Sequence, residues 1–321
     1  MFRLSVKQDY PDLCGLWLEA FGEGEESAKF VFEGFSGYQH IYVLEEERAV
    51  VCMACAVPCS LQGKEGIYLY GVATKKSHRG KGLMSALLEY AEQEEKRKGA
   101  EFSVLIPQTP DLFAFYRRLG YETRFYRHAF SVESVPAAAE TLSASPVTAG
   151  GLASLRRANA SRPFVQLNPK ASQAVAEDLT LLKAECFATG RGYAVARKEK
   201  KQVFIEELFA QSPQAAAELV RGICGVYGCQ QAKGYCGGGL FQTEQTMDFG
   251  MIKFLSKPFP MHGAYPEQAQ LQQRRRAAQL RADEVGRYHA QCGKHDYSKN
   301  AAGELFHITN HFQFLLSVSS L

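Results

Sequence analysis

Hydrophobic and polar positions along the first 131 residues follow two periods, one typical of helices and one typical of strands. Apolar residues spaced three or four positions apart predict helices over residues 7–21, 26–34, 82–98 and 112–119. Alternating or continuous apolar runs predict strands over residues 41–45, 50–60, 66–74 and 102–106, with a final strand pair around 121–132. This interleaving of helices and strands predicts an α/β fold for this half of the chain.

A stretch of small residues separates this half from the rest of the chain. Residues 131–151 read SVESVPAAAETLSASPVTAGG, with two prolines and little hydrophobic periodicity, as is typical of linkers between domains. We therefore predict a first domain over residues 1–131, a linker over 132–151 and a second domain over 152–260.

The second half partly repeats the order of elements of the first, although no sequence repeat is visible. Its pattern predicts a helix over residues 174–188, a hairpin of strands over 192–197 and 202–210, and a helix over 213–225. Pro213 lies near the first position of the last helix, where its missing N–H costs little. Residues 261–321 are rich in Gln and Arg, and we assign this tail neither a defined structure nor a function.

Composition limits the class of protein without identifying it. The 321 residues suffice for two domains, and 46% hydrophobic with 22% charged residues is ordinary globular usage. A formal net charge of +3 is too small for electrostatic binding of nucleic acid. No apolar run is long enough to span a membrane, and charges interrupt any signal-like core at the start. We therefore expect a cytoplasmic protein whose nine Cys are reduced.

The informative segment is residues 66–98, where an apolar strand runs into a turn with two glycines that opens a helix. A helix N-terminus aimed out of a sheet presents unpaired N–H groups and the positive end of the helix dipole, which bind phosphate groups. Gly80 and Gly82 let the backbone approach such an anion closely. Positive charge surrounds the turn, from Lys75, Lys76, His78, Arg79 and Lys81. The alternative is an ordinary strand-to-helix turn with a solvated basic face.

Two other phosphate-binding motifs fit this segment less well. A P-loop requires Lys and then Ser or Thr after its last glycine, but Gly82 is followed by Leu83. A dinucleotide fingerprint starting at Gly80 requires a third glycine where Ser85 stands. Glu101 also precedes the next strand, whereas a ribose-binding acid belongs at a strand's end.

The string R-G-K-G-L-M resembles motif A of the GNAT N-acetyltransferases, an α/β family with a mixed sheet. Arg79, Gly82 and Met84 occupy its three defining positions, and Met84 departs from the family's Gly or Ala. The resemblance implies acetyl-CoA as cofactor, bound by the strand backbone and by the N–H groups of the turn. The implied residues are Val72, Ala73 and Thr74 for the pantetheine arm, and Arg79, Gly80, Lys81, Gly82, Leu83 and Met84 for the pyrophosphate.

The string L-F-A-F-Y-R-R-L-G-Y resembles motif B of the same family, Tyr-x-x-x-Gly-aromatic, with Tyr116, Gly120 and Tyr121 at its positions. Thr109 replaces the family's usual Asn. The resemblance implies direct transfer of an acetyl group to a primary amine, with Tyr116 as the general acid that protonates the departing thiolate. The structural alternative for Tyr116 is a core aromatic on an amphipathic helix.

The acceptor side of the reaction is less visible in the sequence. Gly71 allows a bulge that separates this strand from the next one, which would free an N–H near Val72 or Ala73 for the oxyanion. Tyr70 is a candidate for lining the acceptor pocket, and simple packing is its alternative. Glu25 and Glu26 are candidates for facing a cationic acceptor, although a solvated helix start explains them equally well. No general base is evident.

The turn before the second domain's last predicted helix reads Q-S-P-Q-A, which offers neither a glycine nor a basic residue. The arrangement resembles the tandem GNAT proteins, including the enhanced-intracellular-survival acetyltransferases. The resemblance implies a second GNAT-like domain that lacks the cofactor loop and helps to wall the acceptor site. Two other functions stay open: a non-catalytic acyl-CoA sensor, favoured by a buried Tyr116, and an aminoacyl transferase with a tRNA-borne donor.

We expect a small-molecule or peptide amine as the acceptor that this protein binds. We expect no metal site. Cys52 and Cys55 lie three apart on a predicted strand and so point to opposite faces. His289, Cys292 and His295 share one helical spacing but lack a fourth ligand. The sequence does not indicate the identity of the acceptor or the oligomeric state.

Overall fold

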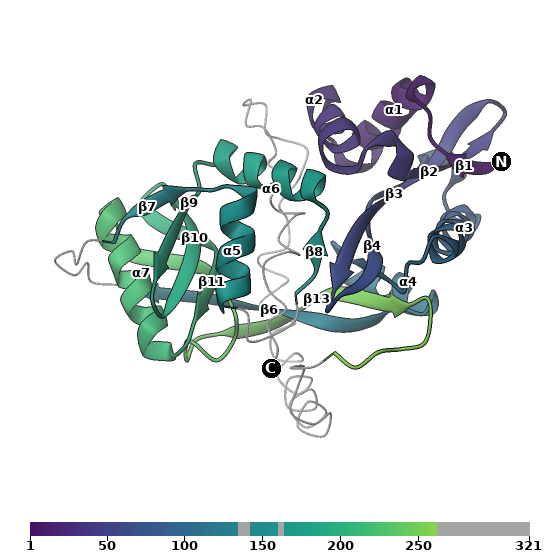
Figure 1. Cartoon of the computed structure of the whole chain (residues 1–321). Coiled ribbons are helices and arrows are strands. Elements are labelled where there is room, and N and C mark those ends of the chain that lie inside the picture. Colours follow the sequence, from purple (N-terminus) through teal and green to yellow (C-terminus); the bar gives the residue numbers. More distant parts are fainter. Residues whose placement is uncertain (134–141, 160–163, 262–321) are drawn as a thin grey trace, which may run out of the picture.

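The computed structural model describes residues 1–133, 142–159 and 164–261, which form an N-terminal unit and a C-terminal unit (Figure 1). The N-terminal unit, residues 1–133, contains β1 (Phe2–Leu4), α1 (Tyr10–Phe21), α2 (Glu25–Lys29), the π-helical segment η2 (Phe30–Ser36), β2 (Ile41–Glu46), β3 (Ala49–Leu61), β4 (Lys64–Thr74), α3 (Leu83–Arg97), β5 (Phe102–Leu105), α4 (Pro110–Arg118) and β6 (Glu122–Glu133). Short 3₁₀ turns lie at η1 (Lys7–Asp9), η3 (Tyr38–His40) and η4 (Lys76–His78).

The C-terminal unit begins at residue 142. It contains β7 (Ala144–Pro146), α5 (Ala149–Asn159), β8 (Gln166–Leu167), α6 (Pro169–Leu181), β9 (Glu185–Thr189), β10 (Gly192–Glu199), β11 (Gln202–Ala210), α7 (Pro213–Tyr227), β12 (Gln231–Cys236) and β13 (Gln245–Phe254). Among the described residues, no helix is long and apolar enough to cross a membrane.

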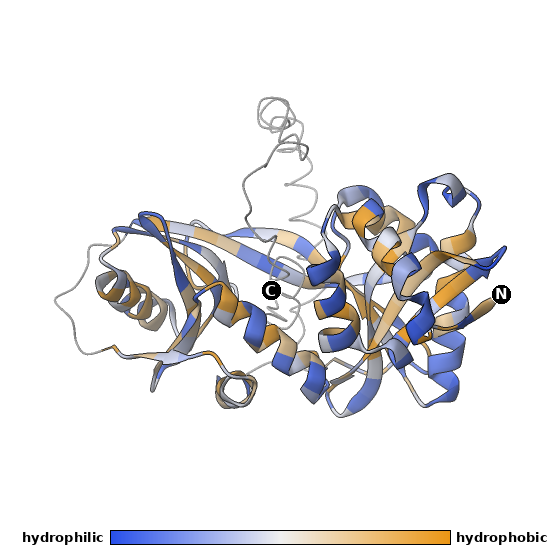
Figure 2. Cartoon of the chain, turned by 90° about the horizontal axis from the view of Figure 1, so that it is seen from above, coloured by the Kyte–Doolittle hydropathy of each residue, from blue (hydrophilic) through white to orange (hydrophobic). Residues whose placement is uncertain are grey.

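One mixed sheet of thirteen described strands runs through both units in the order β1-β2-β3-β4-β5-β13-β6-β12-β11-β10-β9-β7, with β8 paired to β3. The order shows a reciprocal exchange of strands. β13 ends the C-terminal unit but lies between β5 and β6, while β6 ends the N-terminal unit and pairs with β12. Figure 1 shows β6 and β13 crossing between the units, and Figure 2 shows the units at opposite ends of these strands.

The two units repeat one arrangement around a parallel strand pair. β4 and β5 pair in parallel, and α3 connects them; β11 and β12 pair in parallel, and α7 connects them. In each unit the exchanged strand then extends the sheet antiparallel to the second of these strands. The mixed α/β sheet predicted from the sequence is confirmed, and it contains two units of the same design.

Three hydrophobic clusters hold the layers together. One lies under α3 and contains Leu69 and Leu87, and another lies under α7 and contains Ile223. The largest lies on the opposite face of the N-terminal sheet and contains both Trp17 of α1 and Leu179 of α6. Because α6 belongs to the C-terminal unit, the two units share a core as well as a sheet.

Most predicted elements are present within a few residues of their expected bounds, and two of the predicted elements are wrong. The expected strand pair at 121–132 is the single strand β6, because no turn residue interrupts its alternation. The helix expected over 174–188 ends at Leu181, since Lys183 adopts a positive φ of 58° and the chain then enters β9.

The predicted linker, 132–151, contains structure of its own. β7 pairs with β9 at the edge of the sheet, a position where a proline is tolerated, and α5 starts at Ala149. β13 lies in the segment predicted as the second domain, 152–260, and yet it pairs in the first unit. Apart from Met261, the predicted tail lies outside the described residues.

The exchange predicts that the N-terminal unit depends on β13 for its stability. Ile252 is fully buried and pairs with Val104 of β5 and Glu122 of β6. We expect Ile252→Ala to lower the free energy of unfolding by about 2–5 kcal/mol, as cavity-forming core changes do. Urea denaturation should show one transition at lower urea. As a control, Val226→Ala on the exposed side of α7 should change stability by less than about 0.5 kcal/mol. A separate early transition of the C-terminal unit alone would contradict this view.

Candidate active site

The site begins where β4 and β5 separate. Their parallel pairing ends at Leu69 and Leu105, but β4 continues to Thr74, so its last residues have no β5 partner. Gly71 has a φ of 58°, and the pairing of β4 with β3 shifts register at this point. The bulge predicted at Gly71 is thus confirmed. It exposes the β5-facing backbone edge of Val72–Thr74, which a ligand can extend as an additional strand.

Trp17 of α1 fixes this bulge from one face of the sheet. A Cβ added to Gly71 would lie 3.1 Å from Trp17 Cζ3, and the positive φ already disfavours any other residue. The Trp17 ring also packs against Tyr70, with ring centroids 6.1 Å apart. Glycine is therefore required at residue 71 for both conformation and space.

The predicted phosphate loop follows β4 directly. Gly80 and Gly82 have φ angles of 77° and 75°, and nothing lies within 4 Å of a Cβ added to either one. The Arg79 Nε donates a hydrogen bond to the Thr74 carbonyl (2.9 Å), which ties the loop to the end of β4. Open space above two left-handed glycines leaves the backbone accessible, as an anion site requires.

Helix α3 presents its N-terminus at this loop without a side-chain cap. Gly82 is the N-cap, and the first helical bond runs from the Ala86 N–H to the Gly82 carbonyl (3.2 Å). The N–H groups of Leu83, Met84 and Ser85 therefore have no partner within the helix. The Met84 side chain packs against the cluster under α3, so its bulk does not require space on the ligand side.

The corresponding helix of the C-terminal unit is closed. The Ser212 side chain caps α7 by accepting a hydrogen bond from the Ala215 N–H (3.1 Å), and Pro213 at the first turn has no N–H to offer. No glycine opens this turn. Among the described residues, the helix N-terminus is therefore open at α3 and capped at α7.

Tyr116 lies on α4, the helix that follows β5 in the chain, and only 6% of it is exposed. Its ring packs against Phe115 and Tyr121, with centroids 5.0 and 5.7 Å away. Among the described residues, no hydrogen bond to its hydroxyl is present. Burial raises the pKa of Tyr116, so the phenol is protonated at neutral pH.

A buried polar network holds the end of motif B in place. The Tyr121 hydroxyl donates to Glu92 Oε1 (2.6 Å) and lies 2.6 Å from Ser103 Oγ. Lys253 of β13 donates to Glu92 Oε2 (2.5 Å). Gly120 precedes this network with a φ of 90°, which favours glycine. The exchanged strand thus contributes a charge to the support of Tyr121, against which Tyr116 packs.

Tyr70 is buried on the face of β4 that looks toward α1 and α6, and two carboxylates act on it. Glu23 and Asp178 both raise the pKa of Tyr70 electrostatically, in addition to the larger effect of burial. Glu23 is 8% exposed and accepts hydrogen bonds from Trp17 Nε1 (3.1 Å) and the Ser27 hydroxyl. It forms no ion pair within the described part of the chain. Burial raises the pKa of Glu23 despite the two hydrogen bonds.

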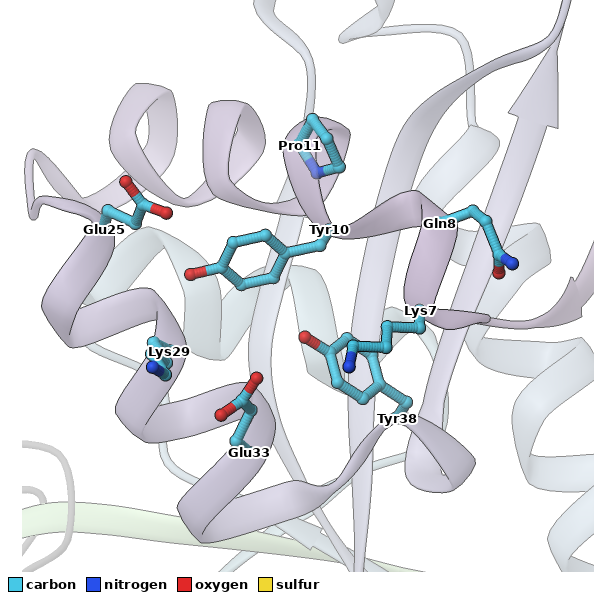
Figure 3. Close-up of a pocket in the computed structure, with 8 residues that line it drawn as sticks. All are labelled: Lys7, Gln8, Tyr10, Pro11, Glu25, Lys29, Glu33 and Tyr38. Carbon is cyan, nitrogen blue, oxygen red and sulfur yellow. The ribbon is translucent and has the colours of Figure 1, made fainter.

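The two acids predicted for the acceptor site lie elsewhere on α2. Glu25 and Glu26 are exposed at the start of this helix. Glu25 lines an outer pocket of about 470 Å³, where Figure 3 shows it on the same helical segment as Lys29 and Glu33. The eight lining residues are Lys7, Gln8, Tyr10, Pro11, Glu25, Lys29, Glu33 and Tyr38, and none of them belongs to β4, the loop or α4.

The cysteines follow the predicted geometry on the strand. Cys52 packs in the cluster under α3, and Cys55 packs in the cluster on the opposite face. Within residues 1–133, 142–159 and 164–261, no group of three His, Cys, Asp or Glu side chains converges as metal ligands do. The His289, Cys292 and His295 set lies outside the described residues.

Sequence reasoning missed Glu23, Asp178 and Lys253. Glu23 precedes Gly24, as many loop acids precede a glycine, and Asp178 lies on an ordinary amphipathic helix. Lys253 lies far from Glu92 in sequence. No local pattern marks any of the three as functional. Asp178 and Lys253 act on residues of distant elements. Glu23 has local hydrogen-bond partners, but it acts on Tyr70 of the distant strand β4.

Comparisons with known proteins agree with this geometry. Residues 2–124, which lie within the N-terminal unit, match the family model described as an acetyltransferase (GNAT) domain. Solved structures extend the likeness of fold to both units. A GCN5-related N-acetyltransferase from Kribbella flavida superposes with a TM-score of 0.61 at 17% identity, covering 80% of this chain and 71% of that one.

Two further structures show the same fold. A GCN5-related N-acetyltransferase from Anabaena variabilis has a TM-score of 0.66 at 16% identity, over 80% of this chain and 73% of that chain. Eis1 from Mycobacterium abscessus has a TM-score of 0.62 at 12% identity, over 79% and 74%. The expected resemblance to tandem GNAT proteins of the enhanced-intracellular-survival type is confirmed at the level of fold. Curated protein sequences give no match.

The buried Glu23 predicts a pH-dependent effect on stability. A raised pKa means that the folded protein binds this proton more tightly than the unfolded chain, so Glu23 lowers stability as the pH rises from about 4 through its folded pKa. Glu23→Gln removes that titration. The variant should therefore gain stability relative to wild type between pH 4 and pH 7, measured by urea unfolding. Glu26→Gln, at an exposed position, serves as the control. A loss of stability of Glu23→Gln relative to wild type over this pH range would contradict the raised pKa of Glu23.

Proposed function

We propose that this protein is an N-acetyltransferase that transfers the acetyl group of acetyl-CoA to a primary amine. The observation that carries the proposal is the uncapped N-terminus of α3, opened by Gly80 and Gly82 at the end of a splayed strand within a GNAT domain. Acetyl-CoA supplies the thioester whose carbonyl carbon the amine attacks: a C–N bond forms and the C–S bond breaks.

The cofactor fits the two backbone features already described. The pyrophosphate would be held by the N–H groups of the loop and first turn, Arg79, Gly80, Lys81, Gly82, Leu83 and Met84, with the helix dipole behind them. The pantetheine arm would pair with the free edge of Val72, Ala73 and Thr74, and an N–H released by the Gly71 bulge would stabilise the oxyanion.

The two proton transfers are assigned to groups on either side of β4. Tyr116 would donate its proton to the departing sulfur, and its raised pKa keeps that proton in place until the thiolate forms. Glu23 would accept the proton released by the amine nitrogen. Its burial and its lack of an ion pair within the described residues suit a base whose pKa lies above that of a solvated carboxylate.

The acceptor would approach between α1 and α6, where Tyr70 is buried beside Glu23 and Asp178. Two carboxylates in a buried site attract an acceptor that arrives as an ammonium ion, which must then lose a proton before its nitrogen attacks. The partner is therefore a small-molecule or peptide amine, and the second unit contributes Asp178 to its site.

One observation favours a second candidate function. Tyr116 is buried, as a non-catalytic acyl-CoA sensor would have it. A sensor would bind acetyl-CoA without releasing thiol in the presence of any amine. Turnover across a panel of primary amines, followed by thiol detection, separates the two functions.

Binding of acetyl-CoA is tested by Gly82→Glu, which places bulk and negative charge at the N-terminus of α3. We expect the variant to lose calorimetrically measurable binding, whereas wild type binds one acetyl-CoA per chain. Gly63→Glu is a matched control, because Gly63 has a φ of 74° and equally open surroundings in a distant hairpin turn. Micromolar binding by Gly82→Glu, or two molecules bound per wild-type chain, would refute the assignment.

The role of Tyr116 is tested by Tyr116→Phe, which removes the hydroxyl and keeps the ring. Loss of an acid that acts only as the thiolate departs should lower kcat by about 10²–10⁴-fold and leave the affinity for acetyl-CoA nearly unchanged. Tyr90→Phe on α3 is the control and should retain wild-type kcat. If kcat of Tyr116→Phe stays within a few-fold of wild type while chemistry limits the rate, Tyr116 is a packing residue.

A further inference from the structure

Arg127 occupies the middle of β6, where the two units meet. Its guanidinium lies over the ring of Tyr235 from β12, 3.2 Å from the centroid, and 4.8 Å from the centroid of Phe249 next to it on β13. Phe249 belongs to the same hydrophobic cluster as Tyr70 and Phe125. Phe125 is two residues from Arg127 on the strand and so shares its face. Arg127 therefore faces the shared interior between the units.

The guanidinium has no anionic partner among the described residues. It forms no hydrogen bond or ion pair there, and its Nη2 atom is buried without a partner. The carboxylate that acts on it electrostatically is Glu206, which already accepts a hydrogen bond from Arg197 Nε (2.9 Å). Burial lowers the pKa of Arg127 to about 10. Arg127 is only partly exposed, and a charge removed from water is normally paired with an opposite charge. Its unpaired Nη2 donor therefore suits an anionic ligand.

The surrounding rings decide which ligand fits. Tyr235 stacks on a face of the guanidinium, and Phe249 packs close to it. An aromatic ring on the face leaves the edge of the planar group for hydrogen bonding, and two parallel N–H donors on that edge match the two oxygens of a carboxylate. Lys233 and Arg197 on the adjoining strands pack against Phe204, and both are paired with acids.

We propose that Arg127, framed by Tyr235 and Phe249, is a binding site for a carboxylate on the inner face between the two units. Arg127 and Tyr70 lie on the same face but on β6 and β4, separated by β5 and β13, which amounts to roughly 14 Å at about 4.8 Å per strand. An elongated acceptor would place its amine near Tyr70 and its carboxylate at Arg127. This link to the acceptor, unlike the carboxylate site itself, rests on the proposed function.

The site is tested by thermal unfolding of wild type and Arg127→Met in sodium glutarate, in sodium phosphate and in sodium chloride at matched ionic strength. Glutarate should raise the wild-type Tm by several degrees more than chloride does, and phosphate should raise it less. The glutarate-specific shift should vanish in Arg127→Met. In chloride alone the variant should be at least as stable as wild type, because a partly buried charge without an anionic partner has been replaced by an apolar side chain.

Three results would overturn the proposal. The first is a Tm of Arg127→Met several degrees below that of wild type in chloride, or failure of this variant to fold, because either result makes Arg127 a structural residue. The second is an equal glutarate shift in both proteins. The third is a larger shift of the wild-type Tm with phosphate than with glutarate. Arg127→Lys keeps the charge without the planar fork and should retain less than half of the glutarate shift.

Two controls separate this site from its surroundings and from the proposed function. Arg124→Met removes an arginine of the same strand that pairs with Glu122 at the surface, and it should keep the full glutarate shift. Arg127→Met should bind acetyl-CoA with wild-type affinity in calorimetry, because the cofactor loop lies on α3. Absence of acetyl-CoA binding in wild type would refute the proposed function, and the glutarate experiment would still decide the carboxylate site.

Discussion

The pairing of β13 between β5 and β6 is the constraint on which the rest of the structure depends. A strand that ends the C-terminal unit completes the sheet of the N-terminal unit, and β6 returns the exchange by pairing with β12. Neither sheet is complete from its own sequence segment, since unpaired backbone groups at these positions would lie inside the molecule. The exchange also brings Lys253 to Glu92 and so supports Tyr121 beside Tyr116.

The candidate active site uses this rigid frame to leave backbone groups free at two places. β4 continues beyond Leu69, where its pairing with β5 ends, and α3 starts at a glycine that has no side chain to cap it. Unmet backbone donors are normally costly, but both sets are near the surface, where water or a ligand can pair with them. The equivalent helix start at α7 uses Ser212 and Pro213 to close the same position. One architecture therefore leaves the helix N-terminus open in one unit and capped in the other.

The inner face between the units carries buried charge of both signs. Glu23 and Asp178 act on Tyr70 at one end, and Arg127 lies at the other end against Tyr235 and Phe249. Groups of this kind are expensive to bury, and a hydrophobic core between two units has no need of them. Their placement on one face puts two carboxylates at one end of the interior and a guanidinium at the other.

Local pattern determined much of this protein: the elements of the first 131 residues, the hairpin of β10 and β11, and the loop at Gly80 and Gly82 follow from periodicity and from the chemistry of glycine, which act over a few residues. The match of R-G-K-G-L-M to motif A belongs to the same local level. Tertiary structure alone decided the strand exchange, the change of 174–188 into a helix followed by β9, and the placement of Glu23, Asp178 and Arg127. The physical reason is that strands and helices far away in the chain surround these residues, and hydrophobic periodicity carries no information about which distant element packs against which.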